Sequence, residues 1–239
     1  MRSPAAAYLP LPMQKRQLSL LARQGAKALA RAILPSSMVI WHGARAQSKD
    51  AQSKSAVALT FDDGPTDLTL EYLRVLDQLD VRATFFLIGE ACAQHPDLVR
   101  AIAGRGHELA NHGYTHRPFT SLSSKELDLE IERTQTLLDV HQPRSHRLVR
   151  PPHGATSLRC MLNCSWAGFT TVLWSFDSGD ARNKDAKEVE RPFAVNSLRD
   201  GDIILLHEGQ PWTLSALPMI VNQLEEAGHE LVTVGELLA

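Results

Sequence analysis

The sequence has few cysteines and few aromatic residues. Only three cysteines occur among 239 residues, and aromatic side chains make up 6% of the chain. A small, odd number of cysteines does not form a disulfide framework, so the sequence excludes a small disulfide-stabilised domain. Cys160 and Cys164 have a C-x3-C spacing without a second pair, which makes them a weak candidate for metal ligands. Free thiols in a reducing compartment are the favoured interpretation.

Long hydrophobic runs are also absent. No stretch approaches the roughly 18 apolar residues of a membrane-spanning helix, and basic residues interrupt residues 15–31, where a signal peptide would need an apolar core. A cytoplasmic protein is therefore expected, with export as the alternative. Residues 17–34 have the spacing of an amphipathic helix with Arg23, Lys27 and Arg31 on one side. Such a helix is typical of peripheral contact with the inner face of an anionic membrane. The alternatives are a helix packed on the domain and a disordered leader.

Positive charge is concentrated near the N-terminus. Residues 1–55 contain nine Lys or Arg and one acid, whereas the remainder contains 16 bases and 26 acids. A basic N-terminal segment followed by an acidic remainder argues against a nucleic-acid-binding core, so no nucleic-acid partner is expected. Residues 44–55 are small and polar, which is typical of a linker. The sequence therefore predicts a basic N-terminal extension over 1–55, with an amphipathic helix and linker, and one globular domain over 56–239.

Hydrophobic patterning over 56–239 alternates between strands and helices. Strands are predicted at 56–61, 83–88, 108–111, 147–150, 170–174, 202–206 and 230–234. Helices are predicted at 68–79, 90–104, 123–138, 157–167, 184–198 and 213–227. Ser123 and Glu126 form a capping-box pattern, whereas Pro192 disturbs the helix that contains it. This alternation predicts parallel β/α architecture. Because no phosphate-binding glycine motif opens a helix, a barrel is favoured over a nucleotide-binding open sheet.

Two groups of possible metal ligands follow predicted strands. Asp62 and Asp63 precede Gly64-Pro65 at the end of the first strand, and His112 and His116 follow the third. Alone, an Asp-Gly turn and an H-x3-H spacing are common structural features. Together, one carboxylate and two imidazoles could bind a zinc-like ion and leave a position open for chemistry, while the second carboxylate acts as a base.

Three further polar segments fall at the ends of later strands. They are Arg150-Pro151-Pro152-His153-Gly154, the stretch from Asp177 to Asp180, and Leu206-His207. An arginine before a stiff Pro-Pro turn can offer a fixed guanidinium to a carboxylate. A lone histidine after a strand is more often structural than catalytic. The carboxyl ends of successive barrel strands share one face, however, so their common placement favours a functional site.

In this order, the five segments resemble those of the polysaccharide deacetylase family, also called the rhizobial nodulation deacetylase homology family or carbohydrate esterase family four. The resemblance covers roughly residues 56–235. It implies a distorted (β/α)7 barrel of the polysaccharide deacetylase type. It also implies a divalent metal held by Asp63, His112 and His116, with Zn²⁺ the first choice and Co²⁺ or Ni²⁺ possible.

The resemblance also implies roles for the remaining polar residues. Asp62 is expected to be the general base, oriented by Arg150, and His207 the general acid, oriented or tuned by Asp177. The expected reaction removes acetyl groups, most readily N-acetyl, from an amino-sugar oligo- or polysaccharide such as a chito-oligosaccharide or peptidoglycan precursor. The alternatives are hydrolysis of a non-sugar C–N bond or a lipid-linked saccharide on the same scaffold, and a non-catalytic carbohydrate-binding domain.

Three positions depart from the family pattern. Gly113 replaces the usual Ser or Thr after the first metal histidine, which is expected to loosen that loop. His153 replaces an aromatic residue and is expected to form a wall against the substrate, with a further metal ligand or a proton donor as alternatives. Ala181 stands where a Trp is usual and removes an apolar platform. Trp212, in the loop after the last motif, is a candidate substrate-binding wall.

Overall fold

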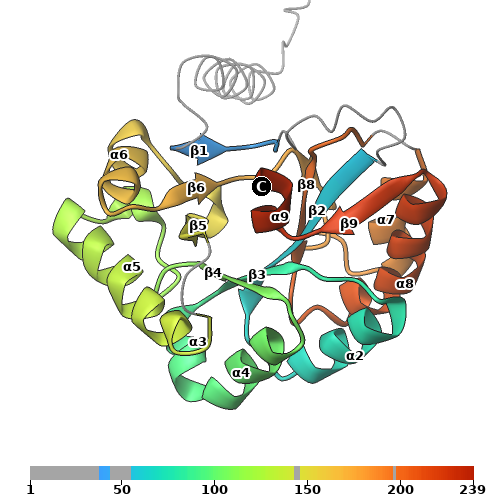
Figure 1. Ribbon diagram of the computed structural model, residues 1–239, viewed down its shortest axis with the longest axis horizontal. Helices are drawn as coiled ribbons and strands as arrows, with labels where there is room; N and C mark the ends of the chain where they lie inside the picture. The colour runs from blue at the N-terminus through green and yellow to red at the C-terminus, as the bar shows by residue number, and fades with distance from the viewer. Residues whose placement is uncertain (1–37, 44–54, 143–145, 196–197) are drawn as a thin grey trace, which may run out of the picture. The chain divides into compact units, whose positions relative to one another are not determined.

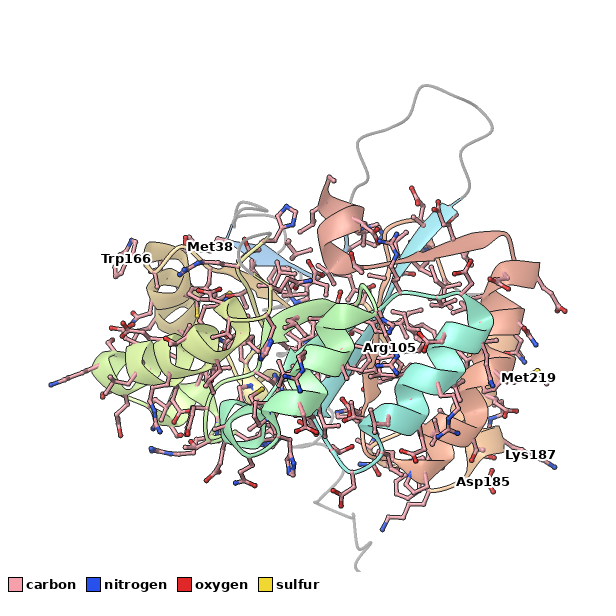
Figure 2. The ribbon with its side chains drawn as sticks, turned by 60° about the horizontal axis from the view of Figure 1, so that its bottom comes forward. Met38, Arg105, Trp166, Asp185, Lys187 and Met219 are labelled. Atoms are coloured by element: carbon pink, nitrogen blue, oxygen red, sulfur yellow. The ribbon has the colours of Figure 1, made fainter. Side chains whose placement is uncertain are left out.

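The structure is a computed structural model that describes residues 38–43, 55–142, 146–195 and 198–239. Its strands form one curved sheet in the order β1-β6-β5-β4-β3-β2-β8-β7, with β9 paired to β2. Every paired strand is parallel to its neighbour. Helices lie around the outside of the sheet, whereas α9 lies near its centre (Figure 1). The predicted distorted (β/α)7 architecture is confirmed.

The strands have the following bounds: β1 Val39–Ile40, β2 Ser55–Gly64, β3 Thr84–Leu87, β4 Glu108–Asn111, β5 Leu148–Val149, β6 Thr170–Val172, β7 Phe176–Asp177, β8 Ile203–His207 and β9 His229–Val232. The α-helices are α2 Thr69–Leu79, α3 Gly89–Gln94, α4 Pro96–Gly104, α5 Ser124–Asp139, α6 Leu158–Trp166, α7 Ala186–Glu190, α8 Pro211–Glu226 and α9 Val234–Leu238. Short 3₁₀ turns lie at Phe119–Ser121, Pro152–Gly154 and Phe193–Val195.

Strand β2 pairs with three other strands, β3, β8 and β9. Its first residues pair with β9, and the stretch from Ala58 to Asp62 pairs with β8. Side chains alternate between the two faces of a strand. Val57, Leu59 and Phe61 pack in the core beneath the helices, whereas Ala56 and Ala58 pack in the cluster inside the curve. The same alternation places Asp62 on the inner face at the carboxyl end of the strand.

Within the part of the chain that the structure describes, no strand pairing joins β1 to β7 to close the sheet. Near this opening, an isolated antiparallel bridge joins His42 to Asp202. Val234 and Leu237 of α9 belong to the cluster inside the curve. The interior is thus packed with side chains, and the polar ends of the strands are left at one rim. Among the described residues, no helix is long and apolar enough to cross a membrane.

Several local features differ from the sequence prediction. The helix predicted over 90–104 is two helices, because Pro96 begins α4 after a break at His95. The helix predicted over 184–198 is divided at Pro192. The predicted capping box of Ser123 and Glu126 is present at α5. Part of the predicted 1–55 extension, residues Val39–Ile40, pairs with β6. The predicted helix over 17–34 lies outside the described residues.

Candidate metal centre and acid–base pair

Three predicted metal ligands meet where β2 and β4 end. Asp63 follows the inward-facing Asp62, and His112 follows β4 directly. Asp63 Oδ1 lies 3.0 Å from His116 Nε2 and 3.4 Å from His112 Nε2. The ligand atoms of all three residues lie within 4.8 Å of one another. Among the described residues, this cluster of one carboxylate and two imidazoles is suited to a zinc-like cation, with no fourth protein ligand in the group.

The buried His112 ring is oriented by a main-chain carbonyl. His112 Nδ1 lies 2.8 Å from the Arg150 carbonyl oxygen, which can only accept a hydrogen bond. The proton is therefore assigned to Nδ1, which leaves Nε2 with a free lone pair toward Asp63. A hydrogen bond of this kind on the distal nitrogen is a regular feature of metal-binding histidines, because it fixes the tautomer and the ring orientation.

The ionisation of Asp63 also suits a cation. Burial alone would raise the pKa of this carboxyl group. When the site holds no cation and His112 and His116 are also protonated on Nε2, their hydrogen bonds and positive charge outweigh burial and hold the pKa of Asp63 well below its usual range. Asp63 and His116 both have left-handed backbones, with φ of 73° and 58°. Such conformations in residues other than glycine cluster at functional sites, where the surroundings must hold them.

Asp62 is fixed by a fully buried arginine. Arg150 Nη1 donates to Asp62 Oδ1 at 2.6 Å and to Thr60 Oγ1 at 2.8 Å. The rest of the guanidinium donates to the carbonyl oxygens of Val172 and Leu173, each at 3.3 Å. Asp62 Oδ2 lies 3.7 Å from His112 Nε2 and so faces the metal ligands. One oxygen is thus held by Arg150, while the other faces the space where a substrate would react.

The partner of His207 is Asp180, not the predicted Asp177. His207 Nδ1 lies 2.8 Å from Asp180 Oδ1, and the backbone N–H of His207 donates to Asp180 Oδ2. Thr213 Oγ1 also donates to Asp180 Oδ2. Asp177 instead accepts from Gly179 N and from Arg182 at 3.0 Å. The orienting role that the family resemblance implied for Asp177 is therefore assigned to Asp180.

Asp180 controls the ionisation of His207. Burial of the ring lowers its pKa, but the hydrogen bond and negative charge of Asp180 raise it, and the charges of Asp62 and Asp63 add to this effect. The net result is a pKa of about 8 for His207. The imidazolium form is therefore populated at neutral pH, and its Nε2 proton is available to a leaving group.

His153 and Trp212, the two predicted substrate-binding residues, have different surroundings. The exposed His153 ring lies 4.6 Å from the His116 ring, centroid to centroid, so His153 borders the metal cluster. Burial and the charge of His116 lower the pKa of His153. Trp212 is partly buried, and its indole N–H donates to the Asp180 carbonyl oxygen. Trp212 thus supports the residue that holds His207, whether or not it also contacts a substrate.

The expectation that Gly113 loosens the metal-ligand loop stays a prediction, and the structure shows which contacts the loop has instead of a side-chain hydroxyl at position 113. A Cβ at Gly113 would approach the Phe119 ring to 3.0 Å, so a larger residue is disfavoured there. The following residues, Tyr114 and Thr115, are held instead by Glu130 on α5. Sequence reasoning missed Glu130. One feature of the sequence could have identified it: Glu130 is an acidic residue at a position whose helical spacing predicts burial in α5.

Glu208 is a second buried carboxyl group that sequence reasoning missed. It accepts hydrogen bonds from Thr69 Oγ1 and from the backbone N–H and hydroxyl of Thr66. A Cβ on Gly64 would collide with this carboxyl group, so the turn after Asp63 is built around it. Burial, with a contribution from the negative charge of Asp63, raises the pKa of Glu208 to about 7 despite these hydrogen bonds.

We expect Glu208→Gln to alter how stability depends on pH. In the unfolded chain a glutamate loses its proton near pH 4.3, whereas folded Glu208 keeps it until about pH 7. The wild-type fold should therefore lose about 3 kcal/mol of stability, relative to the Gln variant, as the pH rises through this window. Denaturant unfolding of both proteins in chelator between about pH 4 and 8 measures the difference. Parallel stability curves would contradict the raised pKa.

Comparison with known proteins gives a consistent result. A family model described as polysaccharide deacetylase matches residues 49–172. A peptidoglycan-N-acetylglucosamine deacetylase of Bacillus cereus is 32% identical over 218 residues, which cover 88% of this chain and 97% of that protein. The peptidoglycan-N-acetylglucosamine deacetylase PgdA of Listeria monocytogenes is 30% identical over 89% of this chain, but the match spans only 44% of PgdA. The crystal structure of the Bc1960 peptidoglycan N-acetylglucosamine deacetylase superposes with a TM-score of 0.76 at 29% identity, covering 84% of this chain and 93% of that one.

Proposed function

The chain belongs to the polysaccharide deacetylase family, and we propose that it removes N-acetyl groups from N-acetylglucosamine units of a peptidoglycan-type glycan. Family membership makes the chain a carbohydrate deacetylase, a hydrolase of amide C–N bonds. The observation that carries the proposal is the meeting of the metal-ligand cluster with a fixed carboxylate and a charged imidazole at one rim of the sheet. The names of the two sequence relatives support the substrate class.

Asp63, His112 and His116 are proposed to hold one divalent cation. Two imidazole nitrogens and one carboxylate oxygen suit Zn²⁺, and Co²⁺ or Ni²⁺ can be bound by similar donors. When bound, such a cation supplies Lewis acidity to an acetyl carbonyl and lowers the pKa of water. The Nδ1–H tautomer of His112 leaves its Nε2 lone pair free for a cation, which is the form of histidine that binds metal.

Asp62 is proposed to be the general base. Its Oδ1 is held by Arg150, which leaves Oδ2 to accept a proton from the attacking water. As that O–H bond breaks, the water oxygen forms a bond to the acetyl carbon. Arg150 is a positioning residue, because all of its described hydrogen bonds go to Asp62 and its surroundings. A positioned base of this kind contributes a rate factor of about 10²–10⁴.

His207 is proposed to be the general acid. Its pKa of about 8 keeps it protonated at neutral pH, and Asp180 holds Nδ1, so Nε2 is the nitrogen that can donate. Transfer of this proton to the amide nitrogen allows the C–N bond to break and releases acetate and a free sugar amine. The base and the acid thus lie on adjacent strands, because Asp62 of β2 pairs in register with His207 of β8.

A substrate panel tests this assignment. The zinc-loaded protein is incubated separately with peptidoglycan glycan fragments, chito-oligosaccharides, acetylated xylan, a lipid-linked N-acetylglucosamine and a cyclic amide. We expect the protein to release acetate from the N-acetylglucosamine substrates. Asp62→Asn, which lacks the base, should release acetate at a rate at least about 100-fold lower. Ring opening of the cyclic amide alone, or acetate release that Asp62→Asn leaves unchanged, would contradict the proposal.

Cellular location and membrane contact remain predictions from the sequence. Residues 17–34, for which contact with an anionic membrane is one interpretation of the amphipathic pattern, lie outside the described residues. A cytoplasmic enzyme would meet peptidoglycan precursors, whereas an exported one would meet the assembled polymer. Fractionation of cells that express the full chain distinguishes the two locations.

A further inference from the structure

The loop over residues 112–116 carries both proposed histidine ligands and contains Gly113. Gly113 has a φ of 76°, and a Cβ there would lie 3.0 Å from a Phe119 ring carbon and 3.5 Å from Glu130 Oε2. A side-chain hydroxyl at this position, as is usual in the family, would therefore have to displace the Phe119 ring. Whatever steadies this loop must come from another part of the chain.

Glu130 of α5 contacts the loop directly. Its Oε2 accepts the backbone N–H groups of Tyr114 and Thr115, both at 2.7 Å, and its Oε1 accepts the Thr115 hydroxyl at 2.7 Å. Glu130 is only 9% exposed. Charge-assisted hydrogen bonds that a buried carboxylate accepts are stronger than neutral ones. One side chain therefore fixes the two residues that immediately precede the ligand His116.

The opposite edge of the loop is held by the beginning of α3. The backbone N–H groups of Gly89 and Glu90 donate to the carbonyl oxygens of Gly113 and Tyr114, each at 2.9 Å. Glu130 accepts hydrogen bonds from backbone N–H groups of the same segment. The loop is therefore held between α3 and α5. The next residue, His116, has a φ of 58°. A left-handed conformation costs about 1–3 kcal/mol in a residue other than glycine and persists only where its surroundings enforce it.

We infer that Glu130 is a positioning residue for the metal centre and sets its affinity by holding His116 in this left-handed conformation. The inference rests on the proposed ligand role of Asp63, His112 and His116. Glu130 acts through hydrogen-bond geometry. Residues that orient metal ligands in this way typically change metal affinity by about 10- to 100-fold when they are replaced.

Two substitutions separate geometry from charge. Glu130→Asp keeps the charge but is one methylene shorter, so it cannot reach all three donors from α5. Glu130→Gln loses the charge, but its oxygen can accept the two backbone N–H groups while its amide donates to the Thr115 hydroxyl. We measure the dissociation constant for Zn²⁺ of the full-length protein by competition with a chromophoric chelator. Glu130→Asp should weaken binding by about 10- to 100-fold, and Glu130→Gln should weaken it less.

A matched control distinguishes positioning from general destabilisation. Leu138→Ala removes a buried side chain close to the C-terminal end of α5, about two helical turns beyond Glu130. It should lower the melting temperature at least as much as Glu130→Asp but leave zinc affinity unchanged. The absorption spectrum of the Co²⁺-loaded protein should change for Glu130→Asp and not for Leu138→Ala, because the spectrum reports the ligand geometry.

Three results would overturn the inference. One is a zinc affinity in Glu130→Asp equal to that of the wild type. Another is a greater loss in Glu130→Gln than in Glu130→Asp, which would make charge the cause. The third is an equal loss in Leu138→Ala, which would make stability the cause. Failure of the wild-type protein itself to bind zinc would instead refute the ligand assignment.

Discussion

His112→Ala is expected to remove zinc binding and acetate release together. His112 is buried, lies 3.4 Å from Asp63 through Nε2, and is oriented through Nδ1 by the Arg150 carbonyl oxygen. Loss of a direct ligand should weaken zinc binding by more than the roughly 100-fold that loss of an orienting residue can cause. The unpaired Arg150 carbonyl should also cost about 1–3 kcal/mol of folding stability. Zinc titration, acetate assays and denaturant unfolding measure these effects.

A histidine outside the cluster provides the control. His141 lies beyond the end of α5, away from the metal-ligand loop, and His141→Ala should retain wild-type zinc affinity and turnover. A His112→Ala protein that still bound zinc with wild-type affinity would show that the metal is held elsewhere. If zinc binding were lost but turnover remained, the cation would be unnecessary for the reaction.

Asp180→Asn is expected to lower kcat/KM by about 10²–10⁴-fold, which is the range for loss of effective proton transfer. The carboxylate of Asp180 accepts from His207 at two atoms and from Thr213. An asparagine cannot accept at both positions, because an NH₂ group, which only donates, replaces one of the two carboxylate oxygens. The His207 ring would lose its orientation and its anionic partner together. Asp177→Asn, which affects an exposed ion pair with Arg182, should stay within about twofold of the wild type.

The pH profile of kcat/KM provides an independent measurement of the same pair. A general acid is active below its pKa, so the wild-type rate should fall as the pH rises through about 8, where His207 loses its proton. Removal of the negative charge of Asp180 lowers the pKa of His207. The decrease in kcat/KM at alkaline pH should therefore begin at lower pH in Asp180→Asn. If Asp177→Asn moved this limb and Asp180→Asn did not, the sequence-based assignment would be right and the structural one wrong.

The exchange of Asp177 for Asp180 shows where sequence reasoning reached its limit. Both residues belong to one short polar segment, and the sequence alone does not give its register on the neighbouring strand. In the structure Asp177 pairs with Leu205, two residues before His207. The chain then turns at Gly179, which has a φ of 77°, and brings Asp180 to His207. A two-residue strand followed by a left-handed turn leaves no periodic pattern from which this could be predicted.

The main features of the site could be predicted because a parallel β/α fold brings strand ends together. Asp62 lies at the end of the strongly apolar strand β2, and His112 follows the short strand β4, so their approach followed from the architecture. Glu130 and Glu208 could not be assigned in this way, because their roles depend on contacts between a helix or strand end and a distant turn. The short elements β1, β7 and α9 were missed because they are too short to show a hydrophobic period.

The central claim is that this site removes acetyl groups from amino sugars with the help of a divalent cation. Its most direct test is acetate release from N-acetylglucosamine oligomers by the purified protein, measured as isolated, after treatment with a chelator, and after zinc or cobalt is added back. We predict that the chelator abolishes release and that metal restores it. Undiminished release by protein shown to be metal-free, or no release by protein shown to carry zinc, would contradict the account.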